Sequence, residues 1–202
     1  MQIISHVNSI FSSNTYILFK ESYIDVWIID PGDTEFIFNW LSINNKNVKG
    51  VLLTHSHFDH IYGLNQLQNN FPFVEVFASV YAKDGLFNDK VNGSYYKEIP
   101  FVINRNDITY LVDGNSIELW PNCKLNVYET PGHGNDCLVF HVENNLFTGD
   151  SLIPGIRVFT KLKNGNKVLA EKSIQKILKT FDKNIMIWPG HEKSCILSSI
   201  NL

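Results

Sequence analysis

The sequence predicts an α+β fold in which one β-sheet packs against another and helices lie outside. Three observations lead to this expectation. Segments rich in β-branched and aromatic residues occur in both halves of the chain. Segments with helical spacing of apolar residues lie between them. The length, 202 residues, favours a single domain covering residues 1–202, which is large enough to hold such layers.

Five short segments of the first half have the composition of strands. They are rich in β-branched or aromatic residues and are bounded by turn-forming residues. One of them, 48–53, is a continuous apolar run, which is typical of a strand buried on both faces. The expected strands are residues 2–7, 15–20, 24–29, 48–53 and 73–78.

Two helices are expected between these strands. The first begins at Asp33 or Thr34, after an Asp-Pro-Gly break, and has Ile37 and Leu41 on its apolar face. The second covers residues 58–69, where apolar side chains recur at helical spacing.

The second half starts with an aromatic-rich but poorly periodic stretch, residues 81–107. We expect a helix followed by a long loop there, and such loops often cover functional sites. Further helices are expected at 169–181 and 192–200. The remaining expected strands are residues 117–119, 125–129, 137–142, 146–148 and 185–188.

Composition and charge exclude several classes of protein. Hydrophobic residues make up 44% of the chain, and no apolar run approaches the roughly 20 residues needed to cross a bilayer, so no membrane partner is expected. The N-terminus lacks the features of a secretory signal, which makes the cytoplasm the expected compartment. A net charge of -3 gives no electrostatic basis for binding nucleic acid. The three cysteines are widely spaced and form no disulfide framework.

Three of the seven histidines lie within the run Thr54-His55-Ser56-His57-Phe58-Asp59-His60. The run joins an expected buried strand to an expected helix, a position where ligands commonly bind in layered structures. His55 and His57 can project together from an extended segment, whereas Asp59 and His60 lie past the turn. Imidazole and carboxylate are good ligands for zinc and similar ions. The cluster therefore favours two metal positions over one.

Three further candidate ligands follow expected strands, and each has a glycine immediately before it. Such residues turn the chain sharply and bring the side chains onto one rim. His6 and His141 match no such position, so we expect structural roles for them. The complete candidate set is His55, His57, Asp59, His60, His133, Asp150 and His191.

The run from Thr54 to His60, with Gly63, resembles the T-H-x-H-x-D-H-x-x-G signature of the metallo-β-lactamase superfamily. Asp30-Pro31-Gly32 and the three later ligands follow in the order and approximate spacing usual for that family, and the resemblance spans residues 14–191. It implies an αββα sandwich of two mixed β-sheets flanked by helices, with the metals at one edge of the sheets.

The resemblance also implies how the ligands are shared between two divalent metal ions. Zinc is favoured for both ions, with iron or manganese as alternatives. The set is similar to that of glyoxalase II and unlike that of the zinc β-lactamases, which use Cys in place of Asp150. By this resemblance the first ion is held by His55, His57 and His133, the second by Asp59, His60 and His191, and Asp150 bridges them.

The sequence departs from the glyoxalase II pattern in two places. The third histidine is followed by Gly134-Asn135-Asp136-Cys137, where such enzymes usually have Thr-Pro-Gly-Ser, so Asp136 is an additional carboxylate near the site. Eleven residues follow His191, fewer than the C-terminal helical domain that helps glyoxalase II bind glutathione. This second departure argues against inferring glutathione specificity.

The expected function is a metal-dependent hydrolase that cleaves an ester, thioester or lactone bond of a small molecule with a metal-bridging hydroxide. Asp59 would orient this hydroxide, and Asp30 and Thr54 would fix the ligands in place. The last 53 residues, Asp150 to Leu202, contain 9 Lys or Arg against 4 Asp or Glu, which is compatible with an anionic substrate. The expected substrate-binding cations are Arg157, Lys161 and Lys163.

Three alternatives stay open at this point. An iron-dependent persulfide dioxygenase shares much of the ligand set but binds one iron and consumes oxygen, and ligand type fixes metal identity poorly. A small-molecule phosphodiesterase of the same superfamily is the second alternative. The third is a non-catalytic metal-bearing protein, against which the intact ligand set argues.

Overall fold

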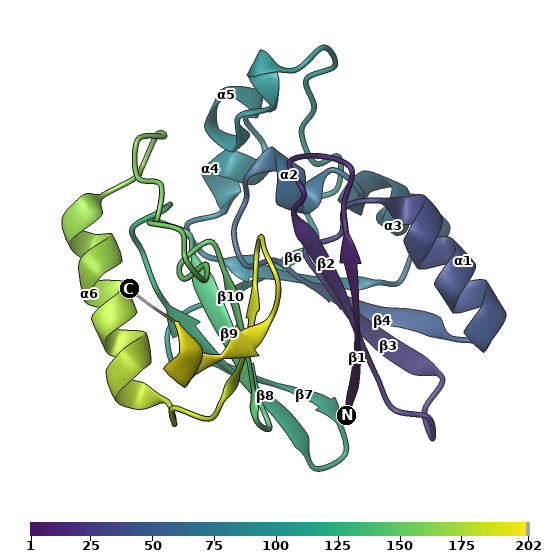
Figure 1. The fold of residues 1–202 in the computed structure, drawn as a ribbon. Helices are drawn as coiled ribbons and strands as arrows, with labels where there is room; N and C mark the ends of the chain where they lie inside the picture. Colours follow the sequence, from purple (N-terminus) through teal and green to yellow (C-terminus); the bar gives the residue numbers. More distant parts are fainter. Residues whose placement is uncertain (201–202) are drawn as a thin grey trace.

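Two six-stranded mixed β-sheets pack face to face, with helices on their outer faces, in the computed structural model, which describes residues 1–200 (Figure 1). One sheet is built from residues 2–111 and the other from residues 116–196. The αββα sandwich expected from the sequence is confirmed.

The first sheet runs in chain order from β1 to β6. Its first three strands are antiparallel, and the strands from β3 to β6 are parallel to one another. The strands are β1 (Gln2–Val7), β2 (Asn14–Phe19), β3 (Asp25–Ile29), β4 (Asn47–Leu52), β5 (Glu75–Ser79) and β6 (Ile108–Leu111). The sequence did not predict β6, because its four residues are mostly half-exposed and too few to show a period.

The second sheet has the order β12-β11-β10-β9-β8-β7 and is antiparallel except between β10 and β11. The helix expected at 192–200 is wrong. Cys195 and Ile196 pair with β11 as an edge strand, and only a 3-10 turn follows. The strands are β7 (Ser116–Trp120), β8 (Cys123–Glu129), β9 (Leu138–Val142), β10 (Asn145–Gly149), β11 (Met186–Pro189) and β12 (Cys195–Ile196).

The helices form the two outer layers. Apolar side chains of α1 and α3 pack on the first sheet, and those of α6 pack on the second. Figure 1 shows α1 and α3 on one side of the sandwich and α6 on the opposite side. The elements are α1 (Thr34–Asn44), α2 (Phe58–Ile61), α3 (Leu64–Asn70), α4 (Lys83–Leu86), α5 (Asp89–Asn92), η1 (Ser94–Tyr96), α6 (Lys167–Thr180) and η2 (Leu197–Ser199).

The helix expected over residues 58–69 is divided into α2 and α3 at Tyr62-Gly63. The backbone N–H of Gly63 donates to the carbonyl oxygen of Pro31 at 3.0 Å. A Cβ at Gly63 would lie 2.2 Å from the carbonyl oxygen of Gly32, so only glycine allows this close approach. The break leaves Asp59 and His60 in the short helix α2, separate from α3.

One hydrophobic core lies between the two sheets, and two tryptophans add hydrogen bonds across it. The indole N–H of Trp27 in the first sheet donates to the carbonyl oxygen of Leu119 in the second at 3.0 Å. Trp120 returns the contact by donating to the carbonyl oxygen of Asp25 at 3.1 Å. These reciprocal bonds satisfy buried indole donors and fix how the sheets are placed relative to each other.

Two further findings concern the cysteines and the helices. The three cysteines are free. Within residues 1–200, no helix combines the length and apolar character needed to span a bilayer.

Candidate metal centre

Loops from both sheets meet at one edge of the sandwich and bring the seven predicted ligands together. Four ligands lie in the β4–α2 connection and α2 itself, and the other three follow β8, β10 and β11. Six of the side chains are buried, and His191 is partly buried. The predicted ligands converge although 136 positions separate the first from the last in the sequence.

The first group consists of His55, His57 and His133. Each offers one nitrogen, and these nitrogens lie within 4.8 Å of one another. Nδ1 of His57 faces Nε2 of His133 at 2.7 Å. Three imidazoles that meet in this way match a facial set of metal ligands.

The second group consists of Asp59, His60 and His191, whose ligand atoms also lie within 4.8 Å of one another. Oδ2 of Asp59 is 3.4 Å from Nε2 of both His60 and His191. The two imidazole nitrogens are themselves 3.3 Å apart.

Asp150 lies between the two groups. Its Oδ1 is 3.6 Å from Nε2 of His60, and its Oδ2 is 3.4 Å from Nε2 of His133 and 3.5 Å from Nε2 of His191. One carboxylate therefore faces both groups, which is the geometry that a bridging ligand requires.

Neighbouring oxygens fix which nitrogen each histidine presents. Nδ1 of His133 is 2.7 Å from the carbonyl oxygen of Phe159, and Nδ1 of His191 is 3.1 Å from that of Phe11. A carbonyl only accepts, so each Nδ1 carries a proton and Nε2 points toward the centre, where the neutral imidazole would offer its lone pair.

The other two Nε2 ligands are oriented by side chains in the same way. Nδ1 of His60 donates to Oδ2 of Asp30 at 3.1 Å, and Nδ1 of His55 lies 3.1 Å from Oγ1 of Thr54. Thr54 Oγ1 donates its own proton to Asp30 at 2.6 Å, so it accepts from His55. Asp30 and Thr54 thus contact the Nδ1 atoms of His60 and His55, which leaves the Nε2 atoms directed at the centre.

Two carboxylates clamp alternate residues of the histidine run. Asp30 accepts from the backbone N–H of Thr54 at 2.7 Å. Asp136 accepts from the backbone N–H of Ser56 at 2.9 Å and from its hydroxyl at 2.5 Å. The additional carboxylate that follows the third histidine therefore supports the loop and does not join the candidate ligands. The sequence identified Asp136 as a carboxylate near the site, but no feature of the sequence predicted its contact with Ser56.

Two buried atoms at the centre have no hydrogen-bond partner within residues 1–200. They are Nε2 of His55 and Oδ1 of Asp150. An unpaired buried polar atom is unfavourable by about 1–3 kcal/mol, and metal coordination would satisfy both. The donor set of imidazole nitrogens and carboxylate oxygens also suits first-row divalent ions. The residues present therefore fit a metal pair.

The carboxylates and imidazoles shift one another's protonation. Burial lowers the pKa of His60, but Asp59 and Asp150 outweigh it and raise that pKa to about 9. Burial also opposes the charged form of His191, yet hydrogen bonds to the same two carboxylates raise its pKa to about 10. Burial raises the pKa of Asp150, but His60, His191 and His133 together outweigh it and hold that pKa well below its usual range.

The first histidine group behaves differently. Burial, followed by the neighbouring His133, lowers the pKa of His57 to about 3. Burial, followed by His60, lowers the pKa of His55 well below its usual value. Both imidazoles are neutral at neutral pH and keep lone pairs for coordination.

The glycines before the ligands are required by crowding. A Cβ at Gly190 would lie 2.1 Å from Oδ1 of Asp150. Gly149 has a φ of +48°, and its Cβ would lie 2.5 Å from Oγ1 of Thr54. Larger residues at either position would displace a ligand or its support.

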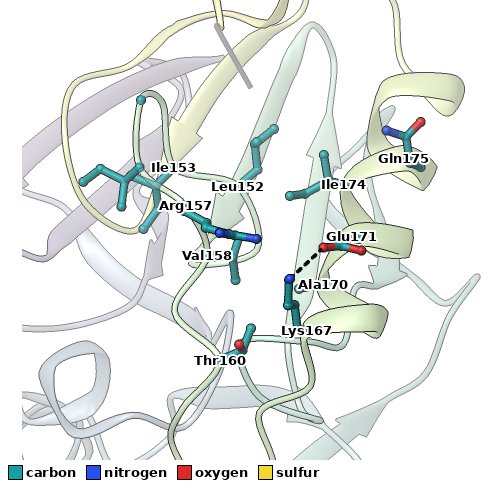
Figure 2. A pocket seen from close by; sticks show the side chains of 12 residues that line it. Leu152, Ile153, Arg157, Val158, Thr160, Lys167, Ala170, Glu171, Ile174 and Gln175 are labelled. Atoms are coloured by element: carbon teal, nitrogen blue, oxygen red, sulfur yellow. Dashed lines mark ion pairs between the residues drawn. The ribbon is translucent and has the colours of Figure 1, made fainter.

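The three predicted substrate cations lie in the segment that follows Asp150. Arg157, Lys161 and Lys163 are exposed and form no ion pair within residues 1–200. Arg157 lines a cavity of about 730 Å³ between this segment and α6. Figure 2 shows its side chain in the same cavity as Ile153, Ile174 and the Lys167–Glu171 ion pair. None of the seven candidate ligands lines this cavity.

The sequence analysis missed the β1–β2 loop as part of the site. Phe11 and Ser12 both have φ values of 55°, a conformation that is unfavourable for residues other than glycine. The loop is held there because Ser13 pairs with His191 and its hydroxyl donates to the carbonyl oxygen of Asp59 at 2.7 Å. No sequence motif marks this loop. The only feature that could have indicated it is an aromatic residue, Phe11, in a segment between two expected strands.

Two hydrolases with known names are similar to this chain in sequence. Hydroxyacylglutathione hydrolase of Buchnera aphidicola subsp. Baizongia pistaciae is 29% identical over 184 residues, covering 91% of this chain and 64% of that protein. Hydroxyacylglutathione hydrolase 1 of Vibrio vulnificus is 32% identical over 149 residues, covering 74% and 51%. The chain thus spans between half and two thirds of the length of these relatives.

Solved structures show the same fold. BLEG-1, a B3 metallo-beta-lactamase, superposes with a TM-score of 0.90 at 24% identity, covering 98% of this chain and 95% of that chain. TTHA1623, solved in a di-iron-bound form, superposes with a TM-score of 0.84 at 19% identity, covering 96% and 95%.

A sequence profile described as the metallo-beta-lactamase superfamily matches residues 11–191, a range that contains all seven candidate ligands. With the αββα sandwich and the His/Asp groups suited to metal binding, this match shows that the chain belongs to the metallo-beta-lactamase superfamily.

Proposed function

We propose that this protein is a binuclear metallohydrolase that cleaves an ester, thioester or lactone bond of a small molecule. The observation that carries the proposal is the convergence of two three-ligand groups on one carboxylate, Asp150. The names of its relatives, hydroxyacylglutathione hydrolases, favour a thioester within this range of substrates.

In this proposal the ligands divide as the two groups suggest. Bound divalent ions, with zinc favoured and iron or manganese as alternatives, would supply a water of lowered pKa as nucleophile and would polarise the scissile carbonyl. His55, His57 and His133 would hold one ion, and Asp59, His60 and His191 the other, with Asp150 shared.

The protein's own groups would orient the reactants. Asp59 uses Oδ2 toward His60 and His191, so its other oxygen is available to orient the attacking water or hydroxide. Asp30 and Thr54 would hold His55 and His60 in the tautomer that keeps Nε2 free.

The segment after β10 is the proposed contact for the rest of the substrate. Arg157, Lys161 and Lys163 would pair with a carboxylate or phosphate. The adjoining cavity next to α6 is lined by apolar side chains around Arg157, which suits a molecule with both an apolar part and an anionic group.

Metal analysis coupled to a substrate panel tests the proposal. We expect two ions per chain, and hydrolysis of thioesters ahead of lactones, phosphodiesters and β-lactams. Chelation is expected to abolish activity, and added metal to restore it. Oxygen uptake with one bound iron would instead favour the persulfide dioxygenase alternative.

Ligand substitutions provide the matched test. His57→Ala and Asp150→Ala are each expected to remove metal and to lower kcat/KM by about 1000-fold or more, about 4 kcal/mol of transition-state stabilisation. His6→Gln is the control, because His6 contacts Asp33 outside the site. Full activity of a metal-free variant would refute the mechanism.

A further inference from the structure

The ammonium group of Lys97 lies against two aromatic rings beside the candidate metal centre. Its Nζ is 4.1 Å from the ring centroid of Phe11 and 4.8 Å from that of Phe58. The two rings meet edge to face with centroids 5.3 Å apart. A cation at these distances is attracted to aromatic faces and is held in a defined place.

Both rings belong to residues that are tied to candidate ligands. Phe58 stands between His57 and Asp59 in the chain. The carbonyl oxygen of Phe11 accepts from Nδ1 of His191. Lys97 therefore lies beside the two chain segments that carry the candidate ligands of α2 and the contact with His191.

Lys97 has no anionic partner in the described part of the chain. Its Nζ makes no hydrogen bond or ion pair within residues 1–200, and this includes the adjacent Glu98. By contrast, Lys49 and Lys176 each pair with a carboxylate. The aromatic faces leave the ammonium N–H donors without an acceptor, although the side chain is partly buried.

We propose that Lys97 is a specificity-determining residue that binds a carboxylate of the substrate. The inference rests on the proposed function, since it assumes that the scissile carbonyl lies at the metal centre. A single ammonium group matches a single negative charge better than a phosphate dianion. Phe11, whose side chain is 63% exposed, would contact the apolar atoms between the carboxylate and the scissile bond.

This contact comes from a different part of the chain than Arg157, Lys161 and Lys163. Those cations follow β10 in the second sheet, whereas Lys97 follows η1 in the first half of the chain. A substrate with an anionic group at each end could use both, but the carboxylate beside Phe11 depends on Lys97 alone.

A pair of thioesters that differ in one carboxylate tests the proposal. The probes are S-butanoyl-N-acetylcysteine and S-butanoyl-N-acetylcysteamine, which lacks only the carboxylate. For the metal-loaded wild type we expect kcat/KM to be about 10- to 100-fold higher for the first probe, the range typical of a hydrogen bond to a charged group. Lys97→Met is expected to raise KM for that probe by a similar factor, leave kcat unchanged and leave the neutral probe unaffected.

Two further variants separate binding from structure. Lys97→Arg keeps the charge and is expected to restore most of the selectivity. Lys90→Met is the matched control, because Lys90 lies 5.0 Å from the ring of Tyr95 in the same segment. If Lys97→Met changed KM equally for both probes, or only lowered the melting temperature, Lys97 would have a structural role only. The proposal would then fail.

A binding measurement distinguishes this proposal from the proposed function. N-acetyl-S-butylcysteine cannot be hydrolysed, and its affinity is measured by isothermal titration calorimetry. If neither thioester is cleaved but this thioether binds the wild type about 10-fold more tightly than Lys97→Met, thioester hydrolysis is wrong and the carboxylate site stands. Equal binding to both proteins would overturn the site.

Discussion

Asp136 accepts two hydrogen bonds from Ser56, one from the backbone N–H and one from the hydroxyl, at 2.9 and 2.5 Å. Ser56 stands between the candidate ligands His55 and His57, so this contact sets the direction in which both imidazoles leave the backbone. Residue 136 reaches the loop from the second sheet, which makes the position of the first metal group depend on both sheets.

Asp136→Ala is expected to weaken metal binding and to destabilise the fold. Two buried donors of Ser56 would lose their acceptor, a loss of about 2–4 kcal/mol in the free energy of unfolding. Metal affinity is expected to fall by about 10- to 100-fold. Urea denaturation and chelator competition measure the two effects, and Asp84→Ala, at an exposed carboxylate, is the control. Unchanged metal affinity would mean that the clamp does not position the histidines.

Gly190→Ala is expected to disturb the bridging carboxylate. The new methyl group would lie 2.1 Å from Oδ1 of Asp150 and 2.9 Å from Cε1 of His60, so one of them must move. We expect metal affinity to fall by about 10- to 100-fold, measured with a chromogenic chelator. Gly114→Ala is the contrast, because Gly114 has a φ of +84° and open space around it. It is expected to destabilise the fold by about 1 kcal/mol and to leave metal binding intact.

Metal binding is expected to release protons. In the metal-free protein the pKa values of His60 and His191 are raised to about 9 and about 10, so both imidazoles are protonated at pH 7.5. Coordination requires their neutral forms, so uptake of metal expels about two protons and apparent affinity rises with pH. Calorimetric titrations with zinc in buffers of different ionisation enthalpy count these protons. Heats that did not depend on the buffer would contradict the assignment.

Asp33 is expected to make the free energy of unfolding depend on pH in the acidic range. Burial raises its pKa, but hydrogen bonds from Tyr62, Ser9 and His6 outweigh this and lower it to about 2. Because the folded pKa lies below the unfolded value of 3.8, the contribution is fully present above pH 4 and is lost as pH falls toward 2. It is about 1–2 kcal/mol at pH 7 after allowance for partial exposure.

Urea unfolding of wild type and Asp33→Asn from pH 7 to pH 3 measures this contribution. Both proteins are compared with chelator present, so that metal loss does not enter the difference. The gap in unfolding free energy is expected to narrow as pH falls below 4. If the difference in unfolding free energy between the two proteins stayed constant with pH, the charge of Asp33 would not be the source of its stabilising effect.

The sequence located the site because its ligands obey local rules. A buried strand followed by His55-Ser56-His57 must end at a sheet edge, and Gly before Asp150 or His191 forces a turn at that edge. The strands that form both sheets were mostly predictable for the same reason, since buried apolar runs are strong local signals.

The features that the sequence did not show depend on contacts between distant residues. The edge strands β6 and β12 are short and mostly half-exposed, and their pairing partners alone define them. The contact of Asp136 with Ser56 spans 80 positions, and that of Lys97 with Phe11 spans 86. Neither pair has a motif, because a hydrogen bond or cation–π contact requires only proximity in the folded chain.

The candidate ligands are divided between the two sheets, which has a mechanical consequence. Four of them come from the first sheet and three from the second, and they face each other across the seam of the sandwich. Two bound metal ions would link the sheets through their ligands and would resist sliding of one sheet over the other. Force applied to pull the sheets apart would then have to rupture coordination bonds before the apolar layer between them could open.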